Sequence, residues 1–267
     1  MRKYLSFLRL KFSMGLQYRA AALAGVITQF AWGGLKILMF AAFYRENPAA
    51  FPMKFEALSS YIWLEQATLA LFMIWGMEYD IFDSITNGNV VYELCRPISI
   101  YNMWFVRGIG YRYAKMVLRC VPVLVLAILL PKPYGLVLPS HIEVWFLFVI
   151  SMMLASLVTI SLCMLIYITC FFTVSSMGIR IITASAFEFL QGGVIPIPFF
   201  PPAIARVMEL LPFAAMQNVP FRIWSGDISG IKIIESMGLQ VFWFVILTLI
   251  GKLMCARAMR RVCVQGG

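Results

Sequence analysis

Six long apolar segments restrict this chain to a small set of folds. The longest of them, residues 144–172, holds no charged side chain. A helix needs about 20 apolar residues to cross a membrane, whereas a transmembrane barrel strand alternates apolar and polar positions. Because the apolar runs here are continuous, we predict membrane-spanning helices and not a barrel. The six predicted spans are residues 21–44, 58–77, 113–130, 144–172, 179–195 and 239–255.

The composition predicts an integral membrane protein with a single domain. Of the 267 residues, 62% are hydrophobic and 13% are charged, against about 45–50% and about 25% in soluble domains. Six spans with their loops use nearly the whole chain and leave no room for a separate soluble domain. We therefore expect one all-α transmembrane domain over residues 1–267, without a cytosolic catalytic domain.

The distribution of cations favours one orientation. With both termini placed in the cytoplasm, 15 of the 22 Lys and Arg residues fall on inner segments and 6 on outer ones. An excess of cations marks the cytoplasmic side of a membrane protein. The net charge of +10 is therefore a topology signal and an attraction to anionic membrane lipid, and it predicts no nucleic-acid partner.

Residues 2–16 are basic and amphipathic. Apolar side chains recur at helical spacing between the cations, which is typical of a helix that lies in the membrane interface. A secretory signal would have a short apolar core and a small-residue cleavage site instead. A plain basic flank before the first span is the alternative.

The sequence contains no motif for nucleotide binding or catalysis. The phosphate-binding loop G-x-x-x-x-G-K-[ST] and the HExxH, CxxC and GxSxG patterns are absent. The single His141 lacks partners and is expected to be a solvated loop residue. The six cysteines fall in spans or on the inner side, so neither a disulfide framework nor a metal site is expected. We predict that the chain is not an enzyme and that a partner chain or an ion gradient supplies any energy.

Two segments between the spans are too apolar to be simple linkers. The inner loop 78–110 is expected to form a short helix that docks a cytosolic partner, or alternatively rests on the membrane. In the outer segment 191–238, prolines flank an expected short helix at 203–211. Because this helix cannot span, residues 196–222 are predicted to re-enter the outer leaflet and border a pathway or a subunit interface.

These two segments together resemble the type-two ABC exporter permease family, and most closely its short six-helix branch. The family's inner loop carries a glycine and a Leu-x-Arg-Pro motif, and this chain has Gly88 followed by Leu94-Cys95-Arg96-Pro97. The family's outer connection carries a proline-aromatic run, a short helix and further Pro and Gly residues. The matching residues here are the run 196–202, the helix 203–211, Pro212-Phe213, Pro220 and Gly226.

The resemblance covers the whole chain and implies a transport role. It implies an elbow helix at residues 2–16, a coupling helix within 80–97 and re-entrant helices near 196–222. It also implies two kinds of partner, namely cytosolic ABC ATPase subunits, which bind ATP and Mg, and a second permease that is identical or different. This chain would bind no cofactor itself. The residues expected in the ATPase-coupling region are Glu93, Leu94, Arg96 and Pro97.

Charged side chains within the spans are the remaining site candidates. Lys36 and Glu65 lie at similar depth on neighbouring spans, which permits an ion pair that fixes helix packing or serves a substrate pathway. Glu188 is the other intramembrane acid, and Gln191 follows it closely. We expect Glu188 at a cavity or a subunit interface, or paired with Arg180 or a hydroxyl side chain.

The predicted function is the membrane subunit of an ATP-driven exporter in a bacterial inner membrane, with an amphipathic or hydrophobic substrate. One alternative is a membrane scaffold or assembly factor that does not transport. Another is an ion-driven secondary transporter. Such transporters usually show internal repeats, and residues 1–130 do not resemble residues 131–267, which disfavours the third possibility.

Overall fold

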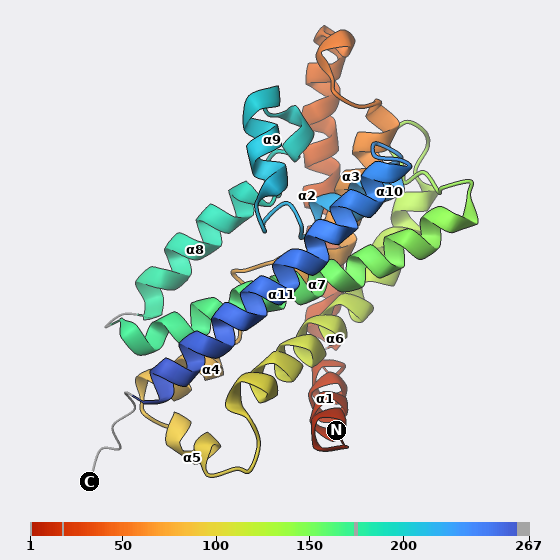
Figure 1. Cartoon of the computed structure of the whole chain (residues 1–267). Coiled ribbons are helices and arrows are strands. Elements are labelled where there is room, and N and C mark those ends of the chain that lie inside the picture. Colours follow the sequence, from red (N-terminus) through yellow and green to blue (C-terminus); the bar gives the residue numbers. More distant parts are fainter. Residues whose placement is uncertain (1, 18, 174–175, 261–267) are drawn as a thin grey trace.

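The computed structural model describes residues 2–17, 19–173 and 176–260. All regular elements in these ranges are helices, and the longer ones form an elongated bundle (Figure 1). The α-helices are α1 (Arg2–Gly15), α2 (Arg19–Glu46), α3 (Phe55–Phe72), α4 (Tyr79–Thr86), α5 (Val90–Leu94), α6 (Ile100–Leu129), α7 (Ile142–Thr169), α8 (Ser176–Leu190), α9 (Pro202–Leu210), α10 (Asn218–Ser225) and α11 (Ile231–Met259). Three 3-10 turns are η1 (Pro48–Ala50), η2 (Cys170–Phe172) and η3 (Ile197–Phe199).

The loops and short helices that connect the long helices lie at two opposite ends of the bundle. Helices α1, α4 and α5 and the C-terminal end of α11 lie at one end, which we call the α5 end. The loop after α2, the loop after α6 and helix α9 lie toward the other end, which we call the α9 end (Figure 1). The first and last described helices therefore finish at the same end of the molecule.

Three helices are long and apolar enough to cross a membrane by themselves. They are α2, α7 together with η2, and α11, within the described part of the chain. The prediction of an all-helical protein is thereby confirmed, and these three helices match the first, fourth and sixth predicted spans. Helices α3, α6 and α8 fall at the other three predicted positions, but they are shorter or carry more charge.

Helix α3 forms the centre of the bundle. Of its 18 residues, 15 are buried, although they include polar side chains. It packs against α2, α6, α7 and α10. The ring of Trp63 stacks on Phe30 of α2 at 5.1 Å between centroids, and the indole nitrogen donates a hydrogen bond to the Tyr134 carbonyl oxygen at 2.8 Å. Helix α3 has no clear lipid-facing side, and it is the helix that its neighbours surround.

Several element boundaries differ from the sequence prediction. Helix α11 begins at Ile231, eight residues before the predicted sixth span, and α3 ends at Phe72, five residues before the predicted end of the second. Helix α6 begins at Ile100, so the second half of the expected inner loop is helical, and only α4 and α5 remain in the connection. Helix α8 ends at Leu190, five residues before the predicted end of the fifth span. Gly192 has a φ of +83°, a left-handed conformation that stops a helix, and prolines follow.

Helix α1 packs closely along α6 because small residues line the contact. A Cβ atom added at Gly15 would lie 2.5 Å from the Cβ atom of Ala114, and one added at Gly110 would lie 3.2 Å from the Leu8 carbonyl oxygen. No residue of α1 is buried. The amphipathic helix predicted at residues 2–16 therefore forms and lies on the surface of the bundle.

Candidate functional site

The four polar residues predicted within the spans come together in one cluster. The ammonium group of Lys36 on α2 lies 2.7 Å from Oε2 and 3.0 Å from Oε1 of Glu65 on α3. Both side chains are largely buried, with 13% and 5% of their surface exposed. An isolated charge at such a position would be costly, so the two charges stabilise each other.

The turn after α8 completes this cluster. Lys36 also donates to the carbonyl oxygen of Gly193 at 2.6 Å, and Gln191 donates from Nε2 to Oε2 of Glu188 at 3.0 Å. Gly193 packs so tightly on the Glu188 carboxylate that an added Cβ atom would lie 2.3 Å from Oε1. Glu188 therefore lies beside the Lys36–Glu65 pair and does not pair with Arg180. Two carboxyl groups and one ammonium group therefore lie together in this cluster.

The cluster lies well below the end of the bundle. Lys36 is ten residues before the last residue of α2, and Glu65 is ten residues after the first residue of α3. At a rise of 1.5 Å per residue, each is about 15 Å from the α9 end of its helix. The two side chains therefore lie at the same depth, as the sequence predicted. The bond to Gly193 places the end of α8 near the same level.

At the α5 end, Glu93 connects α5 to its neighbouring helices. Its Oε2 atom accepts a hydrogen bond from the indole nitrogen of Trp104 on α6 at 2.5 Å, and Oε1 accepts one from the Ser84 hydroxyl of α4 at 3.4 Å. The Trp104 ring is buried and stacks on Phe171 at 6.3 Å between centroids. Glu93 thus joins α5 to α4 and to the first turns of α6.

The other three predicted coupling residues face outward. Leu94 is 43% exposed, Arg96 and Pro97 are exposed, and Tyr92 of the same short helix is 75% exposed. The structure therefore separates the four candidates into Glu93, which bonds within the chain, and an exposed tip. We call Tyr92, Leu94, Arg96 and Pro97 the α5 tip.

Arg107 fixes the start of α4 to α6. Its Nε atom lies 2.7 Å from Oε2 of Glu78, and its Nη2 atom lies 2.8 Å from Oδ2 of Asp80. Burial raises the pKa of the Glu78 carboxyl above its ordinary value, and the Arg107 guanidinium opposes the rise without cancelling it. The Glu78 backbone N–H donates to the Tyr167 hydroxyl at 2.8 Å, which adds α7 to the same junction.

A buried arginine closes the α5 end of helix α3. The guanidinium of Arg112 donates to the carbonyl oxygens of Leu71 and Met73, both at 2.9 Å, and to Sγ of Cys163 at 3.1 Å. These carbonyls are at the C-terminus of α3, where a helix has unpaired acceptors and a partial negative charge. The guanidinium is therefore compensated by backbone dipoles, without a carboxylate among the described residues.

Sequence reasoning missed several of these connecting residues. Trp104, Arg107 and Arg112 lie on α6, and Arg180 of α8 sits 3.8 Å from the ring centroid of Tyr79 on α4. Arg107 and Arg112 were counted only as topology signals, and Arg180 was considered further only as a partner for Glu188. The position of Arg107 and Arg112 beside an apolar run, in the same predicted inner region as Glu78, was the available signal for internal pairing.

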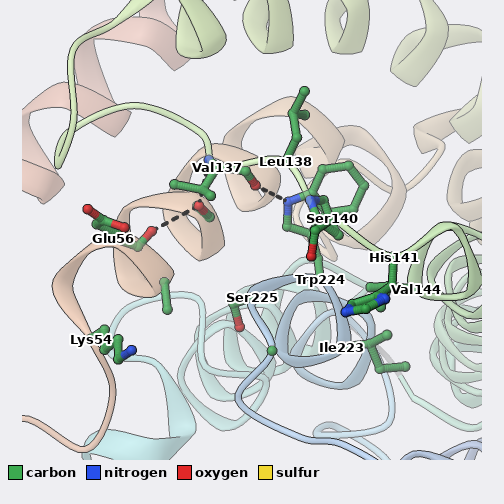
Figure 2. Close-up of a pocket in the computed structure, with 14 residues that line it drawn as sticks. Lys54, Glu56, Val137, Leu138, Ser140, His141, Val144, Ile223, Trp224 and Ser225 are labelled. Atoms are coloured by element: carbon green, nitrogen blue, oxygen red, sulfur yellow. Dashed lines mark hydrogen bonds between the residues drawn. The ribbon is translucent and has the colours of Figure 1, made fainter.

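A cavity of about 300 Å³ lies at the α9 end, between the start of α3, the loop before α7 and α10 (Figure 2). The Val137 backbone N–H donates to the Ser60 hydroxyl at 2.9 Å, and the Trp224 indole donates to the Val137 carbonyl oxygen at 2.9 Å. His141 lines this cavity together with the charged Lys54. These hydrogen bonds attach the loop before α7 to α3 and α10, and so they hold the wall of the cavity in place.

Comparison with known proteins gives one clear match. The model of a family described as ABC-2 family transporter protein matches residues 30–266. This range includes the polar cluster, the α5 tip and the whole of α11. No curated protein matches the chain.

Proposed function

The chain belongs to the ABC-2 transporter family, and on this basis we propose that it is the multi-pass permease subunit of an ATP-driven exporter. In this proposal α2, α3, α6, α7, α8 and α11 are the six spans, and the α5 end faces the cytoplasm of a bacterial cell. Both termini are then cytoplasmic, which agrees with the excess of cations on these segments. ATP and Mg bind to a partner ATPase and not to this chain.

The observation that carries the proposal is an exposed tip on a firmly anchored segment. The α5 tip presents an aromatic ring, an aliphatic side chain and a cation to solvent. Large exposed apolar side chains grouped with a charge are typical of a protein interaction site. We propose that a cytosolic ATPase subunit binds the α5 tip, with α4 and α5 acting as coupling helices.

The anchoring explains how movement of the tip reaches the spans. Glu93 bonds to Trp104, and Arg107 bonds to Glu78 and Asp80, so a displacement of α4 and α5 is passed to α6. Helix α6 has 30 residues and is about 45 Å long, enough to carry the movement across a membrane. Coupling of this kind requires that ATPase contacts differ between two states of the permease.

A second permease would complete the pathway. Within this chain α8 buries none of its residues, and Ile182 is 71% exposed. Helix α2 similarly exposes Ile27 and Leu35, at 72% and 61%. We propose that these apolar faces border the second permease, identical or different, and that the cluster of Lys36, Glu65, Glu188 and Gln191 lies beside the pathway. Few intramembrane charges favour an amphipathic or hydrophobic substrate.

Co-purification tests the proposal. We would co-express the chain with a candidate ABC ATPase from the same genome and measure the ATPase retained on the tagged permease. Replacing Tyr92 and Leu94 by Ala is expected to lower retention at least about fivefold, because the interface loses its apolar centre. The matched control is Leu138→Ala, since Leu138 is 47% exposed at the opposite end. A stable permease complex that retains no ATPase, or equal retention by both variants, would overturn the proposal.

ATP turnover separates docking from transmission. Glu93→Leu removes the acceptor for Trp104 but leaves the α5 tip in place, so ATPase retention should persist while substrate-stimulated ATP turnover falls. Glu93→Gln keeps an acceptor oxygen and should retain more of the stimulation. Neutralising Arg96 should lower both retention and turnover. Unchanged turnover in correctly assembled Glu93 and Arg96 variants would contradict the assigned role of α5.

A further inference from the structure

A cavity of about 390 Å³ lies at the α5 end between α1, α2 and α6. Three cations on two helices line it, namely Lys11 on α1 and Lys115 and Arg119 on α6. Each of these side chains is partly buried. Met14 and Leu118 add an apolar portion to the wall. The cavity thus combines positive charge with hydrocarbon, at the end of the bundle that we propose to be cytoplasmic.

The acidic side chains beside this cavity are already engaged. Glu78 and Asp80 also line it, but Arg107 binds both of them, at 2.7 Å and 2.8 Å. Among the described residues, no carboxylate lies within 4.0 Å of Lys11, Lys115 or Arg119. The single Arg107 guanidinium offsets only one of these two carboxylates, so the three cations, Arg107 and the two acids together carry a formal net charge of +2 at the cavity.

Neighbouring residues hold two of the cations in place. The Arg119 guanidinium packs on the backbone of α2 at Gly25, where an added Cβ atom would lie 2.6 Å from its Cζ atom. Lys115 donates a hydrogen bond to the Tyr111 hydroxyl, and its Nζ atom lies 3.9 Å from the centroid of that ring. A guanidinium fork beside an ammonium group matches the oxygen atoms of a phosphate.

The surroundings of the cavity indicate a lipid and not a soluble anion. Helix α1 leaves Leu5 and Leu10 67% and 55% exposed, as expected for a helix whose apolar face is set into a membrane interface. Basic pockets between helices at the cytoplasmic side suit anionic lipid headgroups. We infer that this cavity binds the phosphate of an anionic phospholipid of the inner leaflet, with its acyl chains beside Met14 and Leu118.

This inference rests on the cytoplasmic placement of the α5 end in the proposed function, but its test needs no ATPase. The purified full chain would be titrated with phosphatidylglycerol or phosphatidylcholine in detergent, and bound lipid would be counted by native mass spectrometry. We expect the chain to prefer phosphatidylglycerol. Replacing Lys115 and Arg119 by Gln should lower its affinity about fivefold for each charge removed. The preference for phosphatidylglycerol should then be nearly lost.

A matched control distinguishes a site from general charge attraction. Replacing Lys252 and Arg257 by Gln removes the same two charges from exposed positions on α11 and should preserve the preference. Equal loss in both double variants would overturn the inference. Full displacement of the lipid by millimolar inorganic phosphate would also overturn it, since the cavity would then be a site for a soluble anion. Loss of ATPase binding would bear only on the proposed function.

A variant that keeps every charge gives an independent test. Gly25→Ala places a methyl group where the Arg119 guanidinium now packs, so phosphatidylglycerol affinity should fall while net charge is unchanged. Gly34→Ala on the same helix is its control, because nothing lies within 4 Å of the added atom. If the double Gln variant does not fold, these two variants decide. Equal affinity in Gly25→Ala and Gly34→Ala would contradict the placement of the phosphate at Arg119.

Discussion

The ammonium group of Lys36 bridges both carboxylate oxygens of Glu65, at 3.0 Å and 2.7 Å, and directs its third donor to the Gly193 carbonyl oxygen at 2.6 Å. A lysine ammonium has three donors, so this group is fully satisfied. The arrangement joins α2, α3 and the turn after α8 at one depth. It is the point at which α2 and α3, which also pack on each other, meet the end of α8.

Removing one partner of this pair should be more harmful than removing both. Lys36→Met leaves Glu65 buried without a counter-charge, and we expect a loss of about 3–5 kcal/mol in the free energy of unfolding. The double variant Lys36→Met with Glu65→Leu should recover most of this loss, because no buried charge remains. Thermal and denaturant unfolding in detergent would measure both. Additive losses in the double variant would contradict the pairing.

Helix α2 should tolerate an added methyl group at Gly34 but not at Gly33, where it contacts α3. A Cβ atom at Gly33 would lie 2.8 Å from the Trp63 ring and 3.1 Å from Cγ of Gln66, whereas Gly34 has open space. We expect Gly33→Ala to cost about 1–3 kcal/mol of stability through overpacking. Gly34→Ala should gain up to about 1 kcal/mol from helix propensity. The two melting temperatures, compared side by side, test this; a similar shift in both would be inconsistent with the close helix contact.

Arg112 should be needed for stability although it pairs with no acid among the described residues. Arg112→Met leaves the carbonyl oxygens of Leu71 and Met73 without their donor, and we expect a loss of about 3 kcal/mol. Arg112→Lys keeps the charge but offers no planar fork, so an intermediate loss is expected. Arg257→Met, at an exposed position, should change stability by less than about 0.5 kcal/mol. Wild-type stability of Arg112→Met would show that the end of α3 needs no donor.

Glu78 should make the stability of the protein depend on pH. Its pKa is raised in the folded protein by burial, so the folded state holds the proton more tightly than the unfolded chain does. The resulting stabilisation is complete below the ordinary pKa of a glutamate and is lost as the pH rises through the raised pKa. Melting temperatures measured between about pH 4.5 and pH 8 should therefore fall more steeply for the wild type than for Glu78→Gln.

The exposed Glu235→Gln variant is the control for this comparison, because it removes the same charge from the surface of α11. It should follow the wild-type pH profile. Parallel profiles for the wild type and Glu78→Gln would show that Glu78 does not titrate differently in the folded state.

The extent of the longest apolar helix could be predicted because it depends on local sequence, whereas α11 begins eight residues before the predicted sixth span. The run 144–172 and the helix α7 with η2 nearly coincide, since twenty or more apolar residues in a row leave the backbone no better way to pair its polar groups in lipid. The helices α1 and α9 were predicted for the same kind of reason, from helical spacing and flanking prolines. The end of α8 was placed too late, because its apolar run continues past Gly192, where the backbone turns.

The sequence could indicate which residues belong to each candidate site, but it could not indicate how those residues are arranged in space. Equal depth on neighbouring helices indicated that Lys36 could reach Glu65, whereas the position of Glu188 depends on the turn that brings Gly193 back toward α2. The segment around Glu93 was predicted as one unit. Only the packing of α5 on α6 separates Glu93, which bonds to Trp104, from the exposed α5 tip.

The sequence by itself determined that this chain is a helical membrane protein, and its motifs indicated the transporter family that the match over residues 30–266 establishes. Those properties follow from hydrophobicity, charge and short motifs, which each stretch of sequence carries independently. The tertiary structure decided which charges neutralise one another and which remain free, as Arg107 and Arg119 illustrate. Electrostatic pairing depends on distances of a few ångströms between helices that are far apart in sequence, and only the packed bundle sets those distances.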